Sequence, residues 1–455
     1  MLAHGVALSG ILAAGVILAA LACGAEPTSG KLRQPSVEKT QPFDCPGCLL
    51  KQRIASAPPG ATIKIAAGIY TLTGGELVID KDLTLVGEGP DVTVIQAANT
   101  WDDAVHRVIR ITEGSVVSIS GVTIRYGNEA STKLRMIPFH SAGIGMPSSG
   151  IEGIYAEFGG GVYNQGTLTL SDSVVTENFA GGGGGIFNGA KITIRNTLIT
   201  GNKSPGYGGG IFNGGILHAV NIVLEDNVAG TGAGINNWGD ASLVGAIINR
   251  NRADSTGGGI QNSSIGVMTL DSSTVSHNGS VVAGGIYNFG WLEIVNGTIS
   301  NNAATSAAGI HSRGTLTLAN STINGNSGRD GGGLVVRPFA QSEGVRISNT
   351  ILAGNTAVQG PDCVGAVISL GHNLIGIDSL CELIAVDGDQ IGTTARPIDP
   401  KLDGLSMNGG QTATNALLPG SPAIDAADSG ACPPVDQRGV KRPRGPSCDI
   451  GSYER

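Results

Sequence analysis

Two sets of asparagines recur along the chain with nearly the same spacing. The first set ends the motif Gly-Gly-Gly-Ile-x-Asn in steps of 24 to 26 residues: Asn164, Asn188, Asn213, Asn237, Asn262 and Asn288, with Ser312 and Val336 continuing the register. The second set has steps of 24 to 29 residues: Asn178, Asn202, Asn227, Asn251, Asn278, Asn302, Asn326 and Asn355. Two independent series with one shared period indicate an internal structural repeat.

Apolar residues two positions apart in each unit predict short strands with one buried face. Pairs such as Leu168/Leu170 and Ile192/Ile194 precede the second asparagine by ten and eight residues, and the isoleucine of the motif forms another apolar column. One such unit cannot bury its apolar face alone, whereas copies stacked about 4.8 Å apart can. The sequence therefore predicts an all-β fold, a right-handed single-stranded parallel β-helix with about 24 residues per coil.

The asparagines have a structural role in this fold. An amide at a corner can bond unpaired backbone groups and the copies of itself in the coils above and below. Asparagine also tolerates the left-handed backbone conformation that corners often need. We therefore expect the second set to form an asparagine ladder.

The spacing of motifs divides the chain into six parts. Fifty residues separate Asn128, which ends an early coil, from Asn178, so one coil carries an insertion. We predict a signal peptide (1–22), a lipoprotein-type tether (23–44), an N-terminal cap with the first coils (45–128), an insertion loop (129–158), the regular array (159–360), and C-terminal coils with a small disulfide-containing cap (361–455).

The N-terminus predicts export. An apolar run at 5–22 fits the hydrophobic region of a signal peptide, and Ala20-Leu21-Ala22-Cys23 resembles a bacterial lipobox. Cys23 is therefore a candidate for lipidation and attachment to a membrane at the cell surface. Cleavage and secretion without an anchor is the alternative.

Six further cysteines, an even number, predict disulfides in an exported chain. Proximity favours Cys45–Cys48, Cys363–Cys381 and Cys432–Cys448, out of about 15 possible connectivities. The formal charge of −8 leaves no basic footprint, so we expect no nucleic-acid partner, and we expect a monomer.

Several motifs resemble a family of bacterial surface proteins. The segment from Cys48 through Pro59-Gly60 to Leu72 looks like the start of β-helix proteins with a CSLREA-type motif, although Leu49-Leu50-Lys51 replaces its usual residues. The repeats resemble right-handed parallel β-helix repeat proteins. The tail, with Ser421-Pro-Ala-Ile-Asp425 and Cys448-Asp-Ile-Gly-Ser-Tyr-Glu454, resembles their choice-of-anchor Q region. The resemblance implies a secreted or cell-surface β-helix and no established reaction.

Carboxylates are sparse in the array, which disfavours the reactions that many extracellular β-helices perform. Lyases of this architecture need a basic residue, usually with clustered carboxylates holding Ca²⁺, and hydrolases need two or three carboxylates. The nearest mixed cluster is Asp254 with Arg250 and Arg252. We predict no cofactor and no metal. Weak catalytic candidates lie in the insertion: Lys133, Arg135 and His140.

The residue x of the repeated motif should point outward, because it alternates with the buried isoleucine. Aromatic residues in such a column could stack on sugar rings. The candidate ligand-binding residues are Tyr163, Phe187, Phe212, Tyr287 and His311, with Asn236 and Gln261 between them. Alternatively, the rings stack on one another or lie under a loop.

These observations favour a non-catalytic exported scaffold, an adhesin-like protein that binds glycan or another cell-surface polymer. One alternative is a polysaccharide lyase or glycoside hydrolase acting on an extracellular polysaccharide. Another is a purely structural envelope protein.

Overall fold

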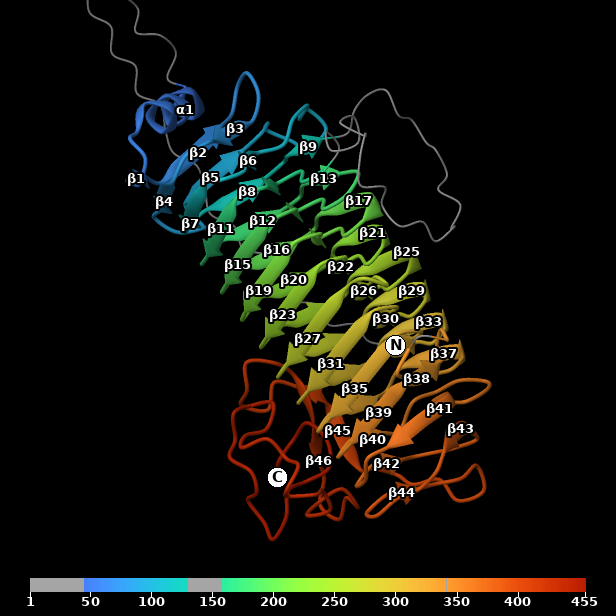
Figure 1. Ribbon diagram of the computed structural model, residues 1–455. Coiled ribbons are helices and arrows are strands. Elements are labelled where there is room, and N and C mark those ends of the chain that lie inside the picture. The colour runs from blue at the N-terminus through green and yellow to red at the C-terminus, as the bar shows by residue number, and fades with distance from the viewer. Residues whose placement is uncertain (1–44, 130–157, 341) are drawn as a thin grey trace, which may run out of the picture. The chain divides into compact units, whose positions relative to one another are not determined.

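The computed structural model describes residues 45–129, 158–340 and 342–455, and these form a parallel β-helix (Figure 1). The described strands include a sheet of 23 strands (sheet A), one of 13 strands (sheet B) and one of 8 strands (sheet C). Like residues stack in register: Phe187 pairs with Phe212, and Asn188 with Asn213, in parallel strands. The predicted fold class and repeat length are confirmed.

Sheet A contains two series of strands that meet at the first set of asparagines. The strands before the corner are β3 (Leu77–Ile79), β6 (Ile109–Ile111), β10 (Val162–Asn164), β14 (Ile186–Asn188), β18 (Ile211–Asn213), β22 (Ile235–Asn237), β26 (Ile260–Asn262), β30 (Ile286–Asn288), β34 (Ile310–Ser312) and β38 (Leu334–Val336). The strands after it are β1 (Ala61–Ile65), β4 (Leu83–Gly87), β7 (Val116–Ser120), β11 (Thr167–Ser171), β15 (Lys191–Arg195), β19 (Ile216–Val220), β23 (Asp240–Val244), β27 (Val267–Asp271), β31 (Trp291–Val295), β35 (Thr315–Ala319) and β39 (Val345–Ser348). Sheet A is completed by β41 (Cys363–Ser369) and β43 (Leu380–Leu383).

Sheets B and C supply the other sides of each coil. Sheet B contains β2 (Gly68–Thr71), β5 (Thr93–Gln96), β8 (Thr123–Arg125), β12 (Val174–Thr176), β16 (Leu198–Thr200), β20 (Val223–Glu225), β24 (Ile247–Asn249), β28 (Thr274–Ser276), β32 (Thr298–Ser300), β36 (Thr322–Asn324), β40 (Ile351–Leu352), β42 (Leu374–Ile375) and β44 (Gln390–Ile391). Sheet C contains β9 (Asn128–Glu129), β13 (Phe179–Ala180), β17 (Lys203–Tyr207), β21 (Val228–Thr231), β25 (Arg252–Thr256), β29 (Gly279–Val282), β33 (Ala303–Ser306) and β37 (Ser327–Asp330).

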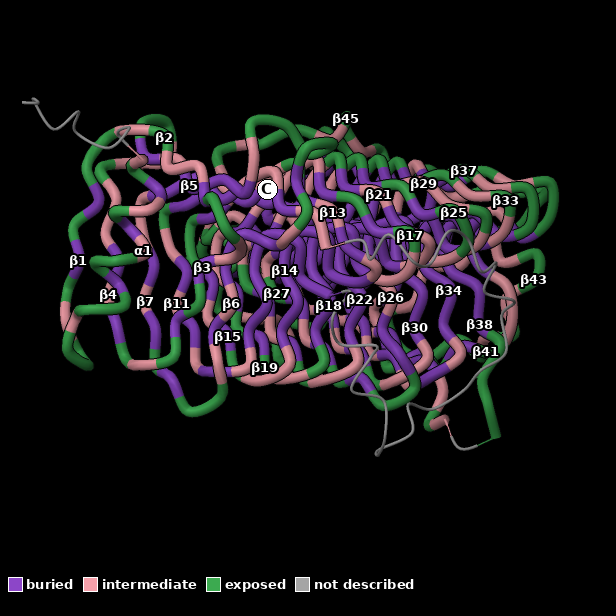
Figure 2. Tube along the Cα trace, turned by 90° about the horizontal axis from the view of Figure 1, so that it is seen from above, coloured by how far each residue is buried: buried purple, intermediate pink, exposed green. Residues whose placement is uncertain are grey.

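The core consists of aliphatic columns inside the coils. Residues such as Ile186, Leu217 and Ile248 are fully buried, and Figure 2 shows buried segments running through successive strands. Along strands such as β15, buried residues alternate with exposed or half-buried ones as the sequence predicted, whereas β14 is buried at all three positions.

Both sets of asparagines form hydrogen-bonded ladders inside the corners. In the first, each Nδ2 donates to Oδ1 of the next asparagine at 2.7–2.9 Å, and Asn288 donates to Ser312 Oγ at 3.2 Å. In the second, the distances are 2.9–3.1 Å, and Asn355 donates to the carboxylate of Asp362. Burial raises the pKa of Asp362.

The expected left-handed backbone lies one residue earlier than the second set of asparagines. Glu177, Asp226 and Arg250 have φ of 53°, 55° and 54°, whereas the ladder asparagines are not among the residues with positive φ. The amide is therefore used for hydrogen bonding, and the preceding residue makes the turn.

The glycines of the motif fold sheet C onto sheet A. Gly183 has φ of 61°, which glycine adopts at little cost. A Cβ on Gly184 would lie 2.3 Å from the carbonyl oxygen of Lys203, so neighbouring coils approach too closely for a side chain there.

An N-terminal helix, α1 (Pro46–Ser56), covers the first coil and buries Leu50 and Ile54. A disulfide joins Cys45, the residue that caps this helix, to Cys48. The described residues contain no helix that is long and apolar enough to cross a membrane.

The C-terminal residues pack against the outer face of sheet B. Thr274 Oγ1 donates to the Ala413 carbonyl at 2.6 Å, Thr298 Oγ1 donates to Gln437 Oε1 at 2.6 Å, and the Ser452 backbone N–H donates to Thr322 Oγ1 at 3.1 Å. This segment contains the antiparallel pair β45 (Leu402–Ser406) and β46 (Thr414–Leu417). It lies along the side of the later coils, in addition to contacting β42 through residues such as Leu417.

The remaining disulfides stabilise this end of the chain. One joins Cys363 to Cys381 between the adjacent strands β41 and β43, and the other joins Cys432 to Cys448 within the C-terminal segment. With Cys45–Cys48, all three pairings expected from proximity are present. Such pairings are typical of proteins from oxidising compartments and are consistent with export.

Candidate functional site

The outward residues of β10 to β38 form a single column, which we call the outer column. Its members are Tyr163, Phe187, Phe212, Asn236, Gln261, Tyr287, His311 and Val335. Their side chains project from the outer face of sheet A, as the sequence predicted, but most of these residues are buried. Phe187 is 4 % exposed and Phe212 is 1 % exposed, so the column is not a row of open rings for a ligand.

The cause of this burial is the glycine turn, which places a residue of sheet C against the outer column. The facing residue stands five positions earlier in the chain. Tyr207 stacks on Phe212 with ring centroids 5.9 Å apart, and Asn236 Nδ2 donates to Thr231 Oγ1 at 3.0 Å. Sequence alternation gives the direction of a side chain but does not reveal the element that covers it.

The N-terminal half of the outer column is occupied by an aromatic cluster whose polar atoms are paired. Rings stack from coil to coil, as in Tyr163 on Phe187 at 5.0 Å, and the cluster comprises Phe158, Tyr163, Phe187, Tyr207, Phe212 and Trp238. Trp238 Nε1 donates to Asn236 Oδ1 at 2.7 Å, and Gln165 Nε2 donates to the Tyr163 hydroxyl at 2.9 Å. These side chains stabilise one another.

His311 breaks this pattern in the C-terminal half. Its ring contacts Tyr287 with centroids 4.9 Å apart, and only 7 % of the residue is exposed. Among the described residues, neither ring nitrogen has a hydrogen-bond partner. The hydroxyl of Ser306, five positions earlier, donates to the Asp330 carbonyl at 3.4 Å. A buried polar group without a partner is rare in folded proteins and calls for an explanation.

Two arginines stand near His311, at the position that follows the ladder residue in consecutive coils. Burial, and to a smaller extent the charges of Arg337 and Arg313, lower the pKa of His311 to about 4. Arg313 lies 4.2 Å from the ring centroid of Phe339 and 5.8 Å from that of Phe289. Among the described residues, no carboxylate lies within ion-pair distance of either arginine.

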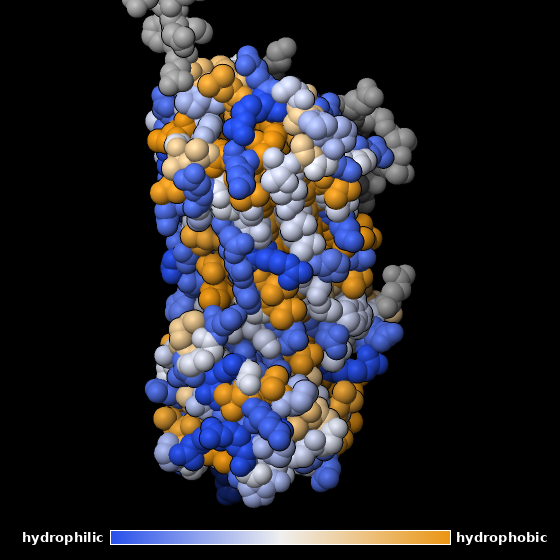
Figure 3. Space-filling model, turned by 90° about the vertical axis from the view of Figure 1, so that its left-hand side faces the viewer, coloured by the Kyte–Doolittle hydropathy of each residue, from blue (hydrophilic) through white to orange (hydrophobic). Residues whose placement is uncertain are grey.

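We call Tyr287, Phe289, His311, Arg313 and Arg337 the arginine patch. Trp291 stands two residues after Phe289, at the start of β31, and is 37 % exposed. The patch therefore combines an imidazole with two cationic groups, and an exposed indole ring follows nearby in the chain. Figure 3 shows the left-hand side of the solenoid of Figure 1, on which apolar and hydrophilic patches alternate.

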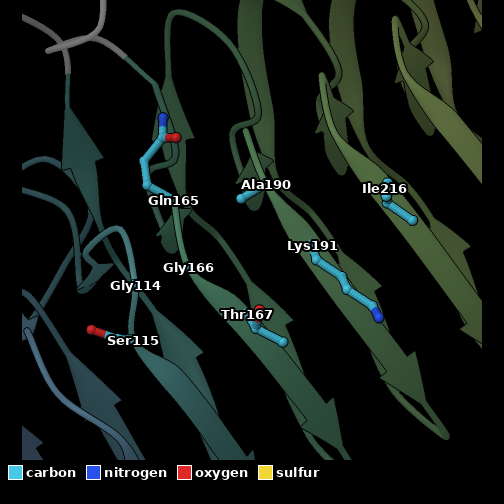
Figure 4. Close-up of a pocket in the computed structure, with 8 residues that line it drawn as sticks. All are labelled: Gly114, Ser115, Gln165, Gly166, Thr167, Ala190, Lys191 and Ile216. Carbon is cyan, nitrogen blue, oxygen red and sulfur yellow. The ribbon is translucent and has the colours of Figure 1, made fainter.

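A shallow hollow lies at the other end of sheet A. Its volume is about 330 Å³, and it is lined by Gly114, Ser115, Gln165, Gly166, Thr167, Ala190, Lys191 and Ile216. In Figure 4 the side chains of Ser115, Gln165 and Lys191 point in different directions, so they do not converge on one ligand atom. This hollow lacks the arrangement that a specific site needs.

The residues that the sequence suggested for catalysis or metal binding lie elsewhere in the chain. Arg250 binds Glu225 and Asp226, each at 2.9 Å, and not Asp254 as the sequence suggested, because stacking brings residues of adjacent coils together. Within the described ranges, no group of three or more His, Cys, Asp or Glu residues is placed to hold a metal ion. Lys133, Arg135, His140 and Cys23 lie outside the described residues.

Comparison with known proteins gives structural similarity at low identity. No family model matches the chain, and no curated protein matches it. A pectate lyase, Pel9A, aligns with a TM-score of 0.42 and 12 % identity over 89 % of this chain and 90 % of its own. An alginate lyase of family PL6, in complex with a trisaccharide, aligns with a TM-score of 0.41 and 11 % identity over 87 % and 92 %.

A third similar structure is the A-module of the mannuronan C-5 epimerase AlgE4 from Azotobacter vinelandii. It has a TM-score of 0.36 and 14 % identity over 75 % of this chain and 92 % of its own. These proteins act on polysaccharides, according to their names. At these identities and scores, the similarity assigns no role to any residue of this chain.

Sequence reasoning identified His311 but missed Arg313 and Arg337. The residue type that follows each member of the first asparagine set was a signal that could have found them. This position holds Gln165, Gly189, Gly214, Trp238, Ser263 and Phe289 in the earlier coils, and then arginine in two successive coils.

Proposed function

We propose that this chain is an exported β-helix protein that binds an acidic polysaccharide at the arginine patch without chemical turnover. The observation that carries this proposal is a pair of arginines in consecutive coils, Arg313 and Arg337, that have no carboxylate within ion-pair distance among the described residues. A ligand that brings negative charge would pair with both guanidinium groups.

The chemistry of the patch favours a carbohydrate carboxylate. A guanidinium group binds a carboxylate through two parallel hydrogen bonds, and its planar fork fixes the orientation of the ligand. The indole of Trp291 offers an apolar face to a sugar ring, while the stacked coils provide an extended surface for several sugar units. Polysaccharides with uronate units combine these features in every repeat.

Binding is favoured over catalysis because His311 would be a weak base. A general base is most effective when its pKa lies near the working pH, whereas burial lowers the pKa of His311 to about 4. Lyase or hydrolase activity remains the alternative function, and the release of unsaturated or reducing products is the measurement that would establish it.

The N-terminal features complete the proposal. Cleavage after Ala22 and lipidation of Cys23 would attach the β-helix to the outer face of a membrane. The CSLREA-like start and the choice-of-anchor Q-like tail support a place among bacterial surface proteins. In this setting, the protein would hold a polysaccharide at the cell surface.

Affinity measurements on the whole secreted chain test the proposal. We expect polygalacturonate or alginate to bind and neutral dextran not to bind. The double variant Arg313→Ala/Arg337→Ala should lose affinity by about 100-fold or more, because each charged hydrogen-bonding group contributes about 1.5–3 kcal/mol. Its melting temperature should stay close to that of the wild type, since neither arginine has an ion pair in the described residues.

Arg195→Ala is the matched control, because Arg195 is an exposed arginine of the same sheet, on β15. This variant should bind acidic polysaccharide as the wild type does. Equal binding of dextran, or wild-type affinity in the double variant, would contradict the proposal. Product release that disappears in the double variant would replace binding with catalysis.

A further inference from the structure

The disulfide between Cys45 and Cys48 differs from the other two disulfides in its exposure. Both of its cysteines are half-buried, and both sulfur atoms contact the hydroxyl of Thr73, an exposed residue, at the surface of the first coil. In the other two disulfides, Cys363 and Cys448 are fully buried. Exposed disulfides are the ones that exchange with thiols, whereas buried ones have structural roles.

The first turn of α1 holds these two sulfur atoms against the end of β2. Gly47 is buried between the cysteines, and a Cβ there would overlap the carbonyl oxygen of Thr71, so only glycine allows this close approach. Cys45 Sγ accepts a hydrogen bond from the Cys48 backbone N–H at 3.2 Å. Thr73 Oγ1 lies 3.0 Å from Cys48 Sγ and 3.5 Å from Cys45 Sγ. The hydroxyl is the donor in both contacts, because a disulfide sulfur carries no hydrogen.

The charges around the disulfide favour a thiolate once the bond is opened. Lys51 Nζ donates to the Thr73 carbonyl at 3.1 Å, which places an ammonium group on the residue that contacts both sulfurs. The first turn of α1 contains no acidic residue, and Glu76, whose charge acts on Lys51, is itself paired with two arginines. The N-terminus of a helix adds partial positive charge. A negative charge on Cys45 Sγ would therefore meet donors and positive charge.

We propose that Cys45–Cys48 is a thiol–disulfide exchange site that oxidises two cysteine thiols of a partner polypeptide. A partner thiolate attacks Cys48 Sγ and forms a mixed disulfide, while the Cys45–Cys48 bond breaks and its electron pair remains on Cys45 Sγ. The second partner thiolate attacks the partner sulfur of that mixed disulfide, and Cys48 leaves as a thiolate. The partner loses two electrons and two protons and gains a disulfide, and the two cysteines of this chain become thiols. Leu49, which follows Cys48 and is 52 % exposed, provides an apolar contact that favours a polypeptide over a small thiol.

The experiment follows each disulfide of the full chain at pH 7 with two probes, reduced glutathione and an apolar synthetic peptide that carries two cysteines. Acid quenching, alkylation and peptide mapping should show that Cys45–Cys48 exchanges at least about tenfold faster than the other two disulfides. Thr73→Val should slow this exchange about three- to tenfold, because the departing thiolate loses a hydrogen bond, whereas Thr73→Ser should stay within about twofold of the wild type. Thr62→Val, at an exposed threonine of β1, is the matched control and should have no effect. Leu49→Ser should slow exchange with the peptide about threefold or more and leave glutathione unaffected.

The quenched intermediate with glutathione identifies the leaving group. Glutathione should be found on Cys48, and the alkyl group on Cys45. Equal exchange rates for all three disulfides would mean that Cys45–Cys48 only clips the helix to the first coil, and would overturn the inference. Glutathione on Cys45, or a normal rate in Thr73→Val, would contradict the assigned direction of attack. Equal behaviour of the two probes in Leu49→Ser would exclude a polypeptide as the preferred partner.

Discussion

At both ends of the outer column an arginine lies on an aromatic ring, but the arginine has a different role at each end. At the first coils, Arg107 lies 4.7 Å from the ring centroid of Tyr163 and is paired with Glu76 at 3.2 Å and Glu129 at 2.9 Å. At the later coils, Arg313 lies over a phenylalanine ring and has no such carboxylate among the described residues. An arginine on an aromatic ring is thus a neutralised structural element at one end and an available cation at the other.

The polar residues of the outer column also differ in whether they have a hydrogen-bond partner. Asn236 and Gln261 each bond a threonine that faces them from sheet C, whereas His311 has no hydrogen-bond partner in the part of the chain that the structure describes. The backbone and the position are shared, so residue type alone does not mark the site. The difference lies in which polar groups remain unsatisfied after folding, because such groups gain most from a ligand.

The largest expected effect is a loss of stability when an aromatic residue is removed from the N-terminal half of the outer column. Phe212→Ala should reduce the free energy of unfolding by about 3–5 kcal/mol, because it leaves a cavity beneath four aromatic neighbours. Chemical denaturation would measure this loss. Affinity for an acidic polysaccharide should not change.

The opposite result would break the comparison. If Phe212→Ala weakened binding and left stability nearly intact, the aromatic half would be the ligand surface that the sequence suggested. Val267→Ala, at a 41 % exposed position on sheet A, serves as the stability control and should change the free energy of unfolding by less than about 0.5 kcal/mol.

The sequence was a good guide to features that depend on the repeat. The period, the strands and the buried aliphatic columns follow from local alternation and from copying one unit. The three cysteine pairings follow from short separations. The asparagine sets were interpretable because an amide can bond its own copy in the next coil, as Asn227 Nδ2 does to Asn251 Oδ1 at 3.0 Å.

Features that depend on contacts between distant segments were missed. The outward column of sheet B changes from Val174, Leu198, Val223 and Ile247 to Thr274, Thr298 and Thr322. Threonines there bond the C-terminal segment, which the sequence placed at the end of the array and not along its side. The covering of the outer column by sheet C was missed for the same reason, since one strand pattern cannot show which segment lies over it.

A pH titration of stability should sharpen the contrast at His311. The folded pKa of about 4 lies below the ordinary value of 6.5, so the neutral imidazole favours folding above pH 6.5. That stability should be lost as the pH falls from 6.5 toward 4. Relative to His311→Phe, which cannot titrate, the wild type should lose about 2–3 kcal/mol between pH 7 and pH 4.5.

Urea denaturation of both proteins at the two pH values measures this difference. Other groups titrate in both proteins, among them the buried Asp362, so only the difference between the two curves reports on His311. A constant difference across this range would show that the imidazole is not confined beside the two arginines, and the distinction from the paired half of the outer column would fail.

The smallest expected effect concerns the extent of the binding surface. Trp291→Ala should weaken binding of an acidic polysaccharide by about five- to tenfold, because one sugar ring would lose an aromatic face worth about 1 kcal/mol. Titration calorimetry would measure this change. Val267→Ala is the matched control, since Val267 pairs with Trp291 in the adjacent coil and has similar exposure. If Trp291→Ala binds normally while the arginine variants do not, recognition is confined to the outer column and does not extend across sheet A.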